Sequence, residues 1–589
     1  MKRHARRTVV GVALSTLAIL IAWAYSYTSP MTPGASREWS KGRVIGRTPV
    51  SRPVALHSAP DQGVLLVWPN LEGQLELAHI GEDGELLLDR VLSVSVEEPR
   101  DPQLQIGPDG RLHLLWREMA EPNAVIRYAL LEADGTLVGR PQLISDPALW
   151  AEAGPRLVLD AEARPHALWA DRTGIQWAVL SRDGRLLEGP TLLIPEGRFP
   201  AVQADREGRL HLAWQYWAGR NTRQIYYALL DPRTGELGPP QEVAQVFQRS
   251  GQRIEGPVLG LDPQTGYVLW SVLDMRAISS RGRYAFFPLN LPRQKRILAL
   301  HLKEGWDPGG MYALAGQRTP LLVALSETVS SMQGEEVQVA VVALARGQTP
   351  EYEVWGLARG TSGGRQACLN PAQVAGTAEA SERREPPAQE WEAEHIVTAS
   401  NLPSVKPILA ADDRSYLHLA WLEPGGFGQY RVVYASTAPE VKRTYNALSL
   451  WDIVDPLFRS VFRLSLALPA VVPILVRWAL VPMGGIVLYH FFTGEEWLER
   501  TRSWVVLGAA VSLEVALTFL LPPRTSVPWP PIRWVAPVVT TGLAGLGTAL
   551  FLRRQTDRSL FGAFFLFTGI HTLLQLAVYF VPWGLGGGL

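Results

Sequence analysis

Four histidines occupy one position of an internal repeat, and they are the first residues whose chemistry needs an explanation. Each stands three residues before a tryptophan that ends an apolar run, and an imidazole there can bind a metal or transfer protons near neutral pH. Equivalent positions of a repeat lie on different structural units, so such side chains converge only in a shared channel. We therefore expect each histidine to hydrogen-bond the neighbouring turn, and we expect no metal site. The four are His113, His166, His211 and His418.

An aromatic and basic loop follows the third of these tryptophans. The loop Tyr216–Gln224 contains Tyr216, Trp217, Arg220 and Arg223. Aromatic faces and guanidinium groups together can hold an acidic sugar or a peptide. We take these four residues as the candidate ligand-binding site, the alternative being an ordinary solvated hairpin loop.

Polar residues inside the apolar C-terminal part form a third candidate set. Arg477, Glu514, His571 and Gln575 interrupt segments that otherwise have the composition of lipid-embedded protein. Ionisable groups in such segments are costly and usually face partners. His571 and Gln575 share one helical face, and Arg477 is a candidate partner for Glu514. In one interpretation these residues hold helices together, and in the other they form a proton or ion path.

Several classes of function lack support in the sequence. We find no phosphate-binding loop, zinc-protease motif or nucleophile elbow, and no residues stand out as catalytic. The single cysteine, Cys368, excludes an intramolecular disulfide and a cysteine-based zinc site. Zero net charge, from 56 basic and 56 acidic residues, argues against a nucleic-acid partner. We expect no cofactor, and a binding role is favoured over an enzymatic one.

The histidines belong to a repeat whose four clear copies align without gaps. A proline stands fourteen residues before the tryptophan in each copy, and an aspartate stands nine before it in three copies. A second apolar run, a turn glycine and a weaker run follow, so one copy comprises four short antiparallel strands. Such units are typical of the blades of a β-propeller, with the tryptophan packed between blades. The structural residues of the repeat are Trp116, Trp169, Trp214, Trp421, Asp160, Asp205 and Asp412.

We expect about seven blades, with six or eight as alternatives. Degenerate copies of the repeat end at Trp68 and Trp270, and a poorer unit occupies residues 320–357. A loop without a packed core is expected from Gly360 to Glu392, because that stretch is rich in Gly, Ala, Glu and Pro. The last blade lacks a fourth strand of its own, and Gly42–Pro49 has the pattern to supply it and close the ring.

The turn Asp205-Arg206-Glu207-Gly208, which leads into a strand ending at Trp214, resembles the turn of neuraminidase-type repeats in sialidase-like propellers. The resemblance spans residues 53–436, although no copy reproduces the family motif Ser-x-Asp-x-Gly-x-Thr-Trp. It implies the propeller fold and adds a sialidase-like glycoside hydrolase as an alternative function. That chemistry needs an arginine cluster, a tyrosine–glutamate pair and an acidic proton donor, and the sequence singles out none of them.

Apolar segments at both ends predict attachment to a membrane. Residues 1–30 combine a basic start with an apolar run and predict a signal peptide or an N-terminal anchor. Residues 464–589 predict four transmembrane helices, although 464–492 suits one kinked span or two short ones. One crossing places Arg553 and Arg558 on the cytoplasmic side with the basic N-terminus, as the positive-inside rule prefers.

Two segments connect these apolar parts. Residues 31–440 form the propeller, outside the cytoplasm. Residues 441–463 mix apolar and basic side chains, which is typical of a helix lying in the membrane interface, with a flexible linker as the alternative.

These features predict a multi-pass cell-membrane protein with an all-β extracytoplasmic propeller and an α-helical transmembrane bundle. The expected role is ligand binding or protein-interaction scaffolding at the cell surface. Membrane lipid is one expected partner, and a glycan, a peptide or a protein is the other. A propeller that senses a ligand for the helical bundle is a further alternative.

Overall fold

The computed structural model describes most of the chain as two compact units. The described residues are 31–447 and 478–580, apart from 33, 35–36, 60–62, 95–96, 121–122, 153, 277–278, 301–307, 315–320, 328–338, 345–396, 399–401, 427, 521–529 and 556–557. One unit runs to Ala447, and the other contains the helices that follow. The expected signal segment, the loop Gly360–Glu392, Arg477 and the part of the interfacial segment from 448 on lie outside the described residues.

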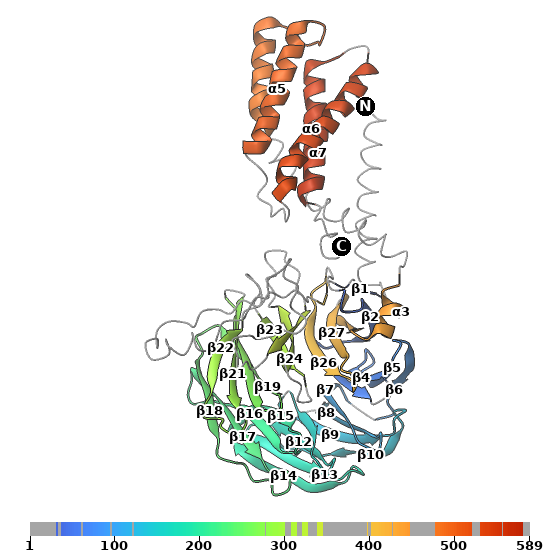
Figure 1. Cartoon of the computed structure of the whole chain (residues 1–589), viewed down its shortest axis with the longest axis vertical. Helices are drawn as coiled ribbons and strands as arrows, with labels where there is room; N and C mark the ends of the chain where they lie inside the picture. Colours follow the sequence, from blue (N-terminus) through green and yellow to red (C-terminus); the bar gives the residue numbers. More distant parts are fainter. Residues whose placement is uncertain are drawn as a thin grey trace. The chain divides into compact units, whose positions relative to one another are not determined.

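The described residues of the first unit form seven antiparallel sheets, which follow one another along the chain (Figure 1). We call them blades 1 to 7. Blade 1 contains β3 (Ala55–Ala59), β4 (Gly63–Pro69), β5 (Leu75–Ile80) and β6 (Leu86–Val91). Blade 2 contains β7 (Pro99–Ile106), β8 (Leu112–Ala120), β9 (Asn123–Leu131) and β10 (Leu137–Leu143). Blade 3 contains β11 (Arg156–Leu159), β12 (Pro165–Ala170), β13 (Gly174–Leu180) and β14 (Leu186–Pro195). Blade 4 contains β15 (Gly197–Ala204), β16 (Leu210–Tyr216), β17 (Thr222–Leu230) and β18 (Gln241–Phe247), and blade 5 contains β19 (Gln252–Leu261), β20 (Thr265–Asp274), β21 (Ser279–Pro288) and β22 (Arg296–Leu300). Blade 6 contains β23 (Pro308–Ala313), β24 (Leu321–Glu327) and β25 (Val339–Leu344). Blade 7 contains β26 (Val405–Ala411), β27 (Leu417–Gly426) and β28 (Gln429–Ser436).

The blades form a closed ring. The first strand of each blade lies against the first strand of the next, and β26 of blade 7 lies against β3 of blade 1. Blade 7 takes its fourth strand from the start of the chain, because β2 (Gly42–Thr48) pairs with β28 in antiparallel register. The short strand β1 (Met31–Thr32) adds to the outer edge of β2. The expectation that the N-terminal segment completes the last blade is confirmed.

The repeated tryptophans fill the space between blades. Trp116, Trp169, Trp214 and Trp421 are at most 3% exposed, and each packs with residues of a neighbouring blade. Burial of such large apolar surfaces is the main stabilising term for a fold whose blades pack mainly against their neighbours.

The repeated proline marks a bulge at the start of the innermost strand. In blades 2, 4 and 7 the register between the first two strands shifts across this proline. The preceding residue has a positive φ in each case: Asp101, Phe199 and Lys406. A bulge of this kind bends the strand and redirects a side chain. One backbone position thus presents a different side chain in each blade.

Blade 6 departs from the sequence-based expectation. Its first strand is β23, a glycine-containing segment that precedes the predicted unit, and the described part of the blade has three strands. The segment carries no repeat tryptophan, so the pattern that identified the other blades was missing there.

The two ends of the ring differ. We call the end where the first strand of each blade begins the front rim, and the opposite end the back rim. Strand β2 begins and β28 ends at the back rim, where helix α3 (Pro439–Tyr445) follows. The Tyr445 hydroxyl donates to the Gly84 carbonyl (2.6 Å) in a back-rim turn of blade 1. The propeller unit therefore extends beyond residue 440, through α3.

The second unit is helical. It contains a helix at Trp478–Thr493 together with α5 (Thr501–Leu520), α6 (Pro530–Arg553) and α7 (Leu560–Phe580). Among the described residues, Thr501–Phe519 is the one helix both long and apolar enough to cross a membrane, and the other three apolar stretches are shorter. A four-span transmembrane bundle therefore stays a prediction, as does the choice between one and two crossings in 464–492.

Candidate functional site

Exposed aromatic side chains of the described propeller all lie at one end of the ring. Each stands in a loop or strand end of the front rim, and their exposed fractions run from 39% to 64%. Exposed aromatic rings can bind the apolar faces of ligands, and their gathering at one end of the ring marks that end as an interaction surface. The front rim is therefore the candidate binding face. The exposed aromatic residues on this face are Trp150, Phe199, Trp217 and Phe247.

Two guanidinium groups approach the ring of Trp217. Arg223 lies 4.5 Å from the ring centroid and Arg198 lies 5.9 Å from it. The Arg223 guanidinium donates to the carbonyls of Gly219 (3.1 Å) and Thr222 (3.3 Å), which fixes it over the ring. Trp217 is half exposed, so a flat, positively charged aromatic surface faces solvent.

The four residues that the sequence singled out do not contribute equally. Trp217 and Arg223 touch each other, and Tyr216 packs edge-on against Tyr226 behind them. Arg220 is exposed in the same loop and makes no interaction within the described part of the chain. Arg198, on blade 4's first strand, is the member that sequence reasoning missed, because it lies far from the loop in sequence.

A carboxyl group with a perturbed pKa stands beside this cluster. Arg198 Nε lies 3.3 Å from Glu152 Oε1, and its guanidinium also donates to the Arg172 carbonyl (3.1 Å). Burial raises the pKa of Glu152, an effect that Arg198 opposes and Asp171 reinforces. Glu152 thus holds Arg198 in place, and its raised pKa favours the protonated form.

A second group of charges lies around the axis of the ring. Asp101 is buried and pairs with Arg117 (3.1 Å) and, more distantly, with Arg52 (3.8 Å). Arg156 of blade 3 and Tyr312 of blade 6 influence each other's pKa, although their blades are not neighbours. Burial raises the pKa of Tyr312, which disfavours its phenolate form.

The repeated histidines are structural. His166 and His211 each lie with Nε2 3.1 Å from the repeat aspartate, and His418 lies 3.4 Å from its own. The other ring nitrogen of His211 is 2.6 Å from a tyrosine hydroxyl of the next strand. The expected hydrogen bond to the turn is confirmed for these three histidines.

His113 lacks the repeat aspartate and contacts Tyr128 instead (2.6 Å). Burial lowers the pKa of His113 to about 4, so the ring is neutral at pH 7. Among the described residues, no group of three or more histidine, cysteine and acidic side chains is arranged to hold a metal ion.

Polar residues of the helical unit form one buried cluster. Glu514 of α5 accepts a hydrogen bond from Thr568 and lies 3.1 Å from His571 Nδ1, both on α7. Gln575 donates to Thr540 of α6 (2.8 Å). The cluster thus ties three helices together. Arg477, the partner suggested for Glu514, lies outside the described residues.

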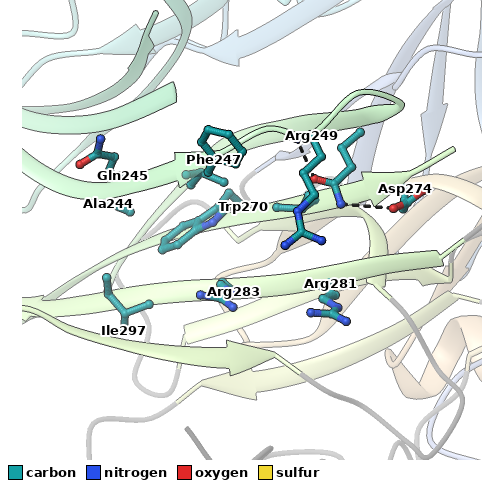
Figure 2. A pocket seen from close by; sticks show the side chains of 12 residues that line it. Ala244, Gln245, Phe247, Arg249, Trp270, Asp274, Arg281, Arg283 and Ile297 are labelled. Atoms are coloured by element: carbon teal, nitrogen blue, oxygen red, sulfur yellow. Dashed lines mark hydrogen bonds between the residues drawn. The ribbon is translucent and has the colours of Figure 1, made fainter. Parts of the chain in front are cut away.

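A cavity of about 440 Å³ lies between blades 4 and 5, next to the front rim. Strand β18 forms one wall and the face of blade 5 that carries Trp270 forms the other. Figure 2 shows Arg249, Arg281 and Arg283 gathered around Trp270. Sequence reasoning missed this site because its residues come from five separate strands and a loop.

Comparisons with known proteins give no family for this chain. No family model matches it, and no curated protein matches it. The resemblance to sialidase-like propellers therefore stays a prediction.

Several solved structures are similar to this chain in fold. The polysaccharide lyase Uly1 has 11% identity and a TM-score of 0.43, over 67% of this chain and 91% of that one. An ulvan lyase bound to a glucuronate–sulfated-rhamnose unit has 9% identity and a TM-score of 0.42, over 66% and 94%. An endo-arabinase from Bacteroides thetaiotaomicron has 14% identity and a TM-score of 0.30, over 44% and 96%. None of these likenesses assigns a ligand or an activity to this chain.

Proposed function

We propose that the propeller binds an anionic carbohydrate on its front rim. The observation that carries this proposal is the Trp217 ring, half exposed and flanked by the guanidinium groups of Arg198 and Arg223. A sugar ring stacks its C–H face on an aromatic ring, and guanidinium groups bind carboxylate or sulfate oxygens in defined directions. A peptide or protein partner is the alternative occupant of the same surface.

We further propose that the propeller is held at a membrane by its back rim. The chain reaches the start of β2 at the back rim, and it ends the propeller there as well, after α3. A membrane anchor attached at either end of the propeller segment would leave the front rim, at the other end of the ring, open to ligands. This orientation suits a scaffold or receptor at the cell surface, and the helical unit is the proposed anchor.

A glycan-array screen of the full chain in detergent tests the proposed binding. We expect acidic glycans to be retained and neutral ones to be lost. Trp217→Ala and Arg223→Gln should each weaken binding about tenfold, since each removes one charged or stacking contact. Arg185→Gln is the matched control, because Arg185 is an exposed back-rim arginine. Equal binding by all four proteins would reject the rim site.

A glycoside hydrolase is the second candidate, favoured by the charges around the axis. Arg52 and Arg117 pair with Asp101, and the charges of Asp101 and Tyr312 influence the pKa of Arg156. An arginine cluster and a tyrosine are two of the groups that hydrolysis of a carboxylated sugar requires, although the raised pKa of Tyr312 opposes its use as a nucleophile. Turnover of a fluorogenic sialoside that Tyr312→Phe abolishes would establish this function, and no turnover would reject it.

A further inference from the structure

A buried carboxylate organises the position next to the repeat tryptophan in blade 2. The Trp116 indole donates to Glu118 Oε2 (3.4 Å), and Arg127 Nε donates to Glu118 Oε1 (2.7 Å). Glu118 therefore joins the indole N–H of the second strand to a guanidinium of the third, and all three side chains lie on the face toward blade 1.

Blade 7 repeats this arrangement. The Trp421 indole donates to Glu423 Oε1 (3.1 Å), and Arg431 Nη2 donates to Glu423 Oε2 (2.6 Å). These three side chains are at most 2% exposed. A tryptophan, a glutamate two residues later and an arginine on the next strand thus form one recurring unit.

Blade 5 has the tryptophan and the arginines of this unit without its carboxylate. Val272 stands two residues after Trp270, where the other two blades have glutamate. Arg283 lies opposite Trp270 and Arg281 lies opposite Val272, which are the two register positions that arginines hold in blades 2 and 7. Trp270 Nε1 is buried and has no hydrogen-bond partner among the described residues.

The cavity between blades 4 and 5 lies at this vacant carboxylate position. Arg249 adds a third guanidinium from the loop after β18, and it makes no side-chain interaction within the described part of the chain. The one acidic lining residue, Asp274, accepts a hydrogen bond from Gln252 (3.2 Å). The lining is thus net positive, and its volume falls in the range of small-ligand sites.

We propose that this cavity receives the carboxylate of an acidic sugar residue, in the place that the glutamate occupies in blades 2 and 7. The inference rests on the proposed glycan binding and names the group that the protein recognises. The carboxylate accepts from the Trp270 indole and from Arg249. Arg281 and Arg283 have interactions of their own and contribute positive charge. Phe247, 64% exposed at the cavity, offers the ring of the sugar a stacking surface.

Blade 1 shows that an unpartnered indole alone does not make such a site. Trp68 Nε1 is also buried without a partner among the described residues. The residue opposite Trp68 is Glu76, whose pKa burial and Asp89 raise to about 7. An acidic group in the arginine position repels a carboxylate. Of the two blades with an indole unpartnered within the described part of the chain, blade 5 is therefore the one in which arginines accompany that indole.

Calorimetric titration of the full chain in detergent with galacturonate trisaccharide tests the ligand's chemistry. We expect binding to the charged trisaccharide and at least about tenfold weaker binding to its carboxyl-reduced form. A sulfated trisaccharide and an acidic peptide are titrated in the same way, to test a sulfate and a peptide carboxylate as the recognised group. Equal affinity for the charged and carboxyl-reduced forms overturns the carboxylate site and leaves the rim proposal standing, whereas the loss of every glycan on the array removes both.

Substitutions at position 272 test the location. Val272→Glu supplies the missing carboxylate from the protein, so we expect loss of trisaccharide binding and a higher unfolding temperature. Val272→Met fills similar space without charge, and we expect it to block binding without raising that temperature. Arg249→Gln should weaken binding about tenfold, with Arg185→Gln as the unaffected control, and this arm holds if Val272→Glu does not fold. Unchanged binding by Val272→Glu or by Arg249→Gln overturns the inference.

Discussion

At the scale of single residues, each repeat aspartate stabilises the fold through hydrogen bonds to its own turn and to the following strand. Asp205 Oδ1 accepts from the Arg209 backbone N–H (2.8 Å), and Oδ2 accepts from Arg209 Nε (2.6 Å) and His211 Nε2 (3.1 Å). Burial alone would raise the pKa of Asp205, but the hydrogen bonds from His211 and Arg209 outweigh burial and lower the pKa to about 2.

This geometry predicts a defined pH dependence of stability. The folded pKa of Asp205 lies below the unfolded value of about 3.9, so its contribution is present above pH 4 and is lost as the pH falls toward 2. Asp205→Asn should lower the free energy of unfolding by about 1–3 kcal/mol at pH 7, and less at pH 3. Thermal unfolding of both proteins across this pH range measures the difference.

The control for this prediction is Glu207→Gln in the same turn. Glu207 is exposed and pairs with Arg209 at 3.3 Å, so its loss should change stability by less than about 0.5 kcal/mol. A difference between wild type and Asp205→Asn that stays constant from pH 7 to pH 3 would contradict the role given to the ionised carboxylate.

At the scale of elements, the closing strand β2 packs closely against blade 1. A Cβ added to Gly46 would lie 2.3 Å from Cζ2 of Trp68, a fully buried side chain. Gly46→Val should therefore push β2 away from its neighbours and lower the free energy of unfolding by about 1–3 kcal/mol. Hydrogen exchange of the β2 amides should become faster than in the wild type.

Gly189→Val provides the matched strand control. A Cβ at Gly189 meets no atom within 4 Å, so its amide exchange and stability should stay near those of the wild type. Equal protection of β2 in both variants would show that this strand is not held against blade 1 as described.

The elements also show what a sequence can and cannot predict. The blades with a Pro-to-Trp repeat were predicted from sequence, because one packing position demands the same residue each time. Strand β23 was missed, since its residues follow no such pattern. The cavity beside Trp270 escaped prediction because it depends on a missing glutamate, and an absence is visible only when strands are compared in register. Arg198 was missed because it lies far from Trp217 in sequence and approaches the ring only in the folded chain.

At the scale of the whole molecule, membrane topology remains a prediction that labelling can test. In a Cys368→Ser background, Ser526→Cys should react with an impermeant thiol reagent in intact cells, and Thr556→Cys should react only after permeabilisation. The reason is that Arg553, Arg554 and Arg558 surround position 556 and favour the cytoplasmic side. Labelling of Thr556→Cys in intact cells would instead favour two crossings in residues 464–492.

The pairing of β2 with β28 also fixes when the propeller can finish folding. Ser40 and Ser436 meet beside that pairing although they are 396 positions apart. At a synthesis rate of about 5–20 residues per second, β2 waits roughly 20–80 s for its partner to be made. During that interval its unpaired backbone is an open edge, and Arg43 and Arg47 make that edge poor at recruiting another chain. The ring of a newly made propeller is thus closed last by β2, one of the first strands to be synthesised, and a chain that ends before β28 cannot close it.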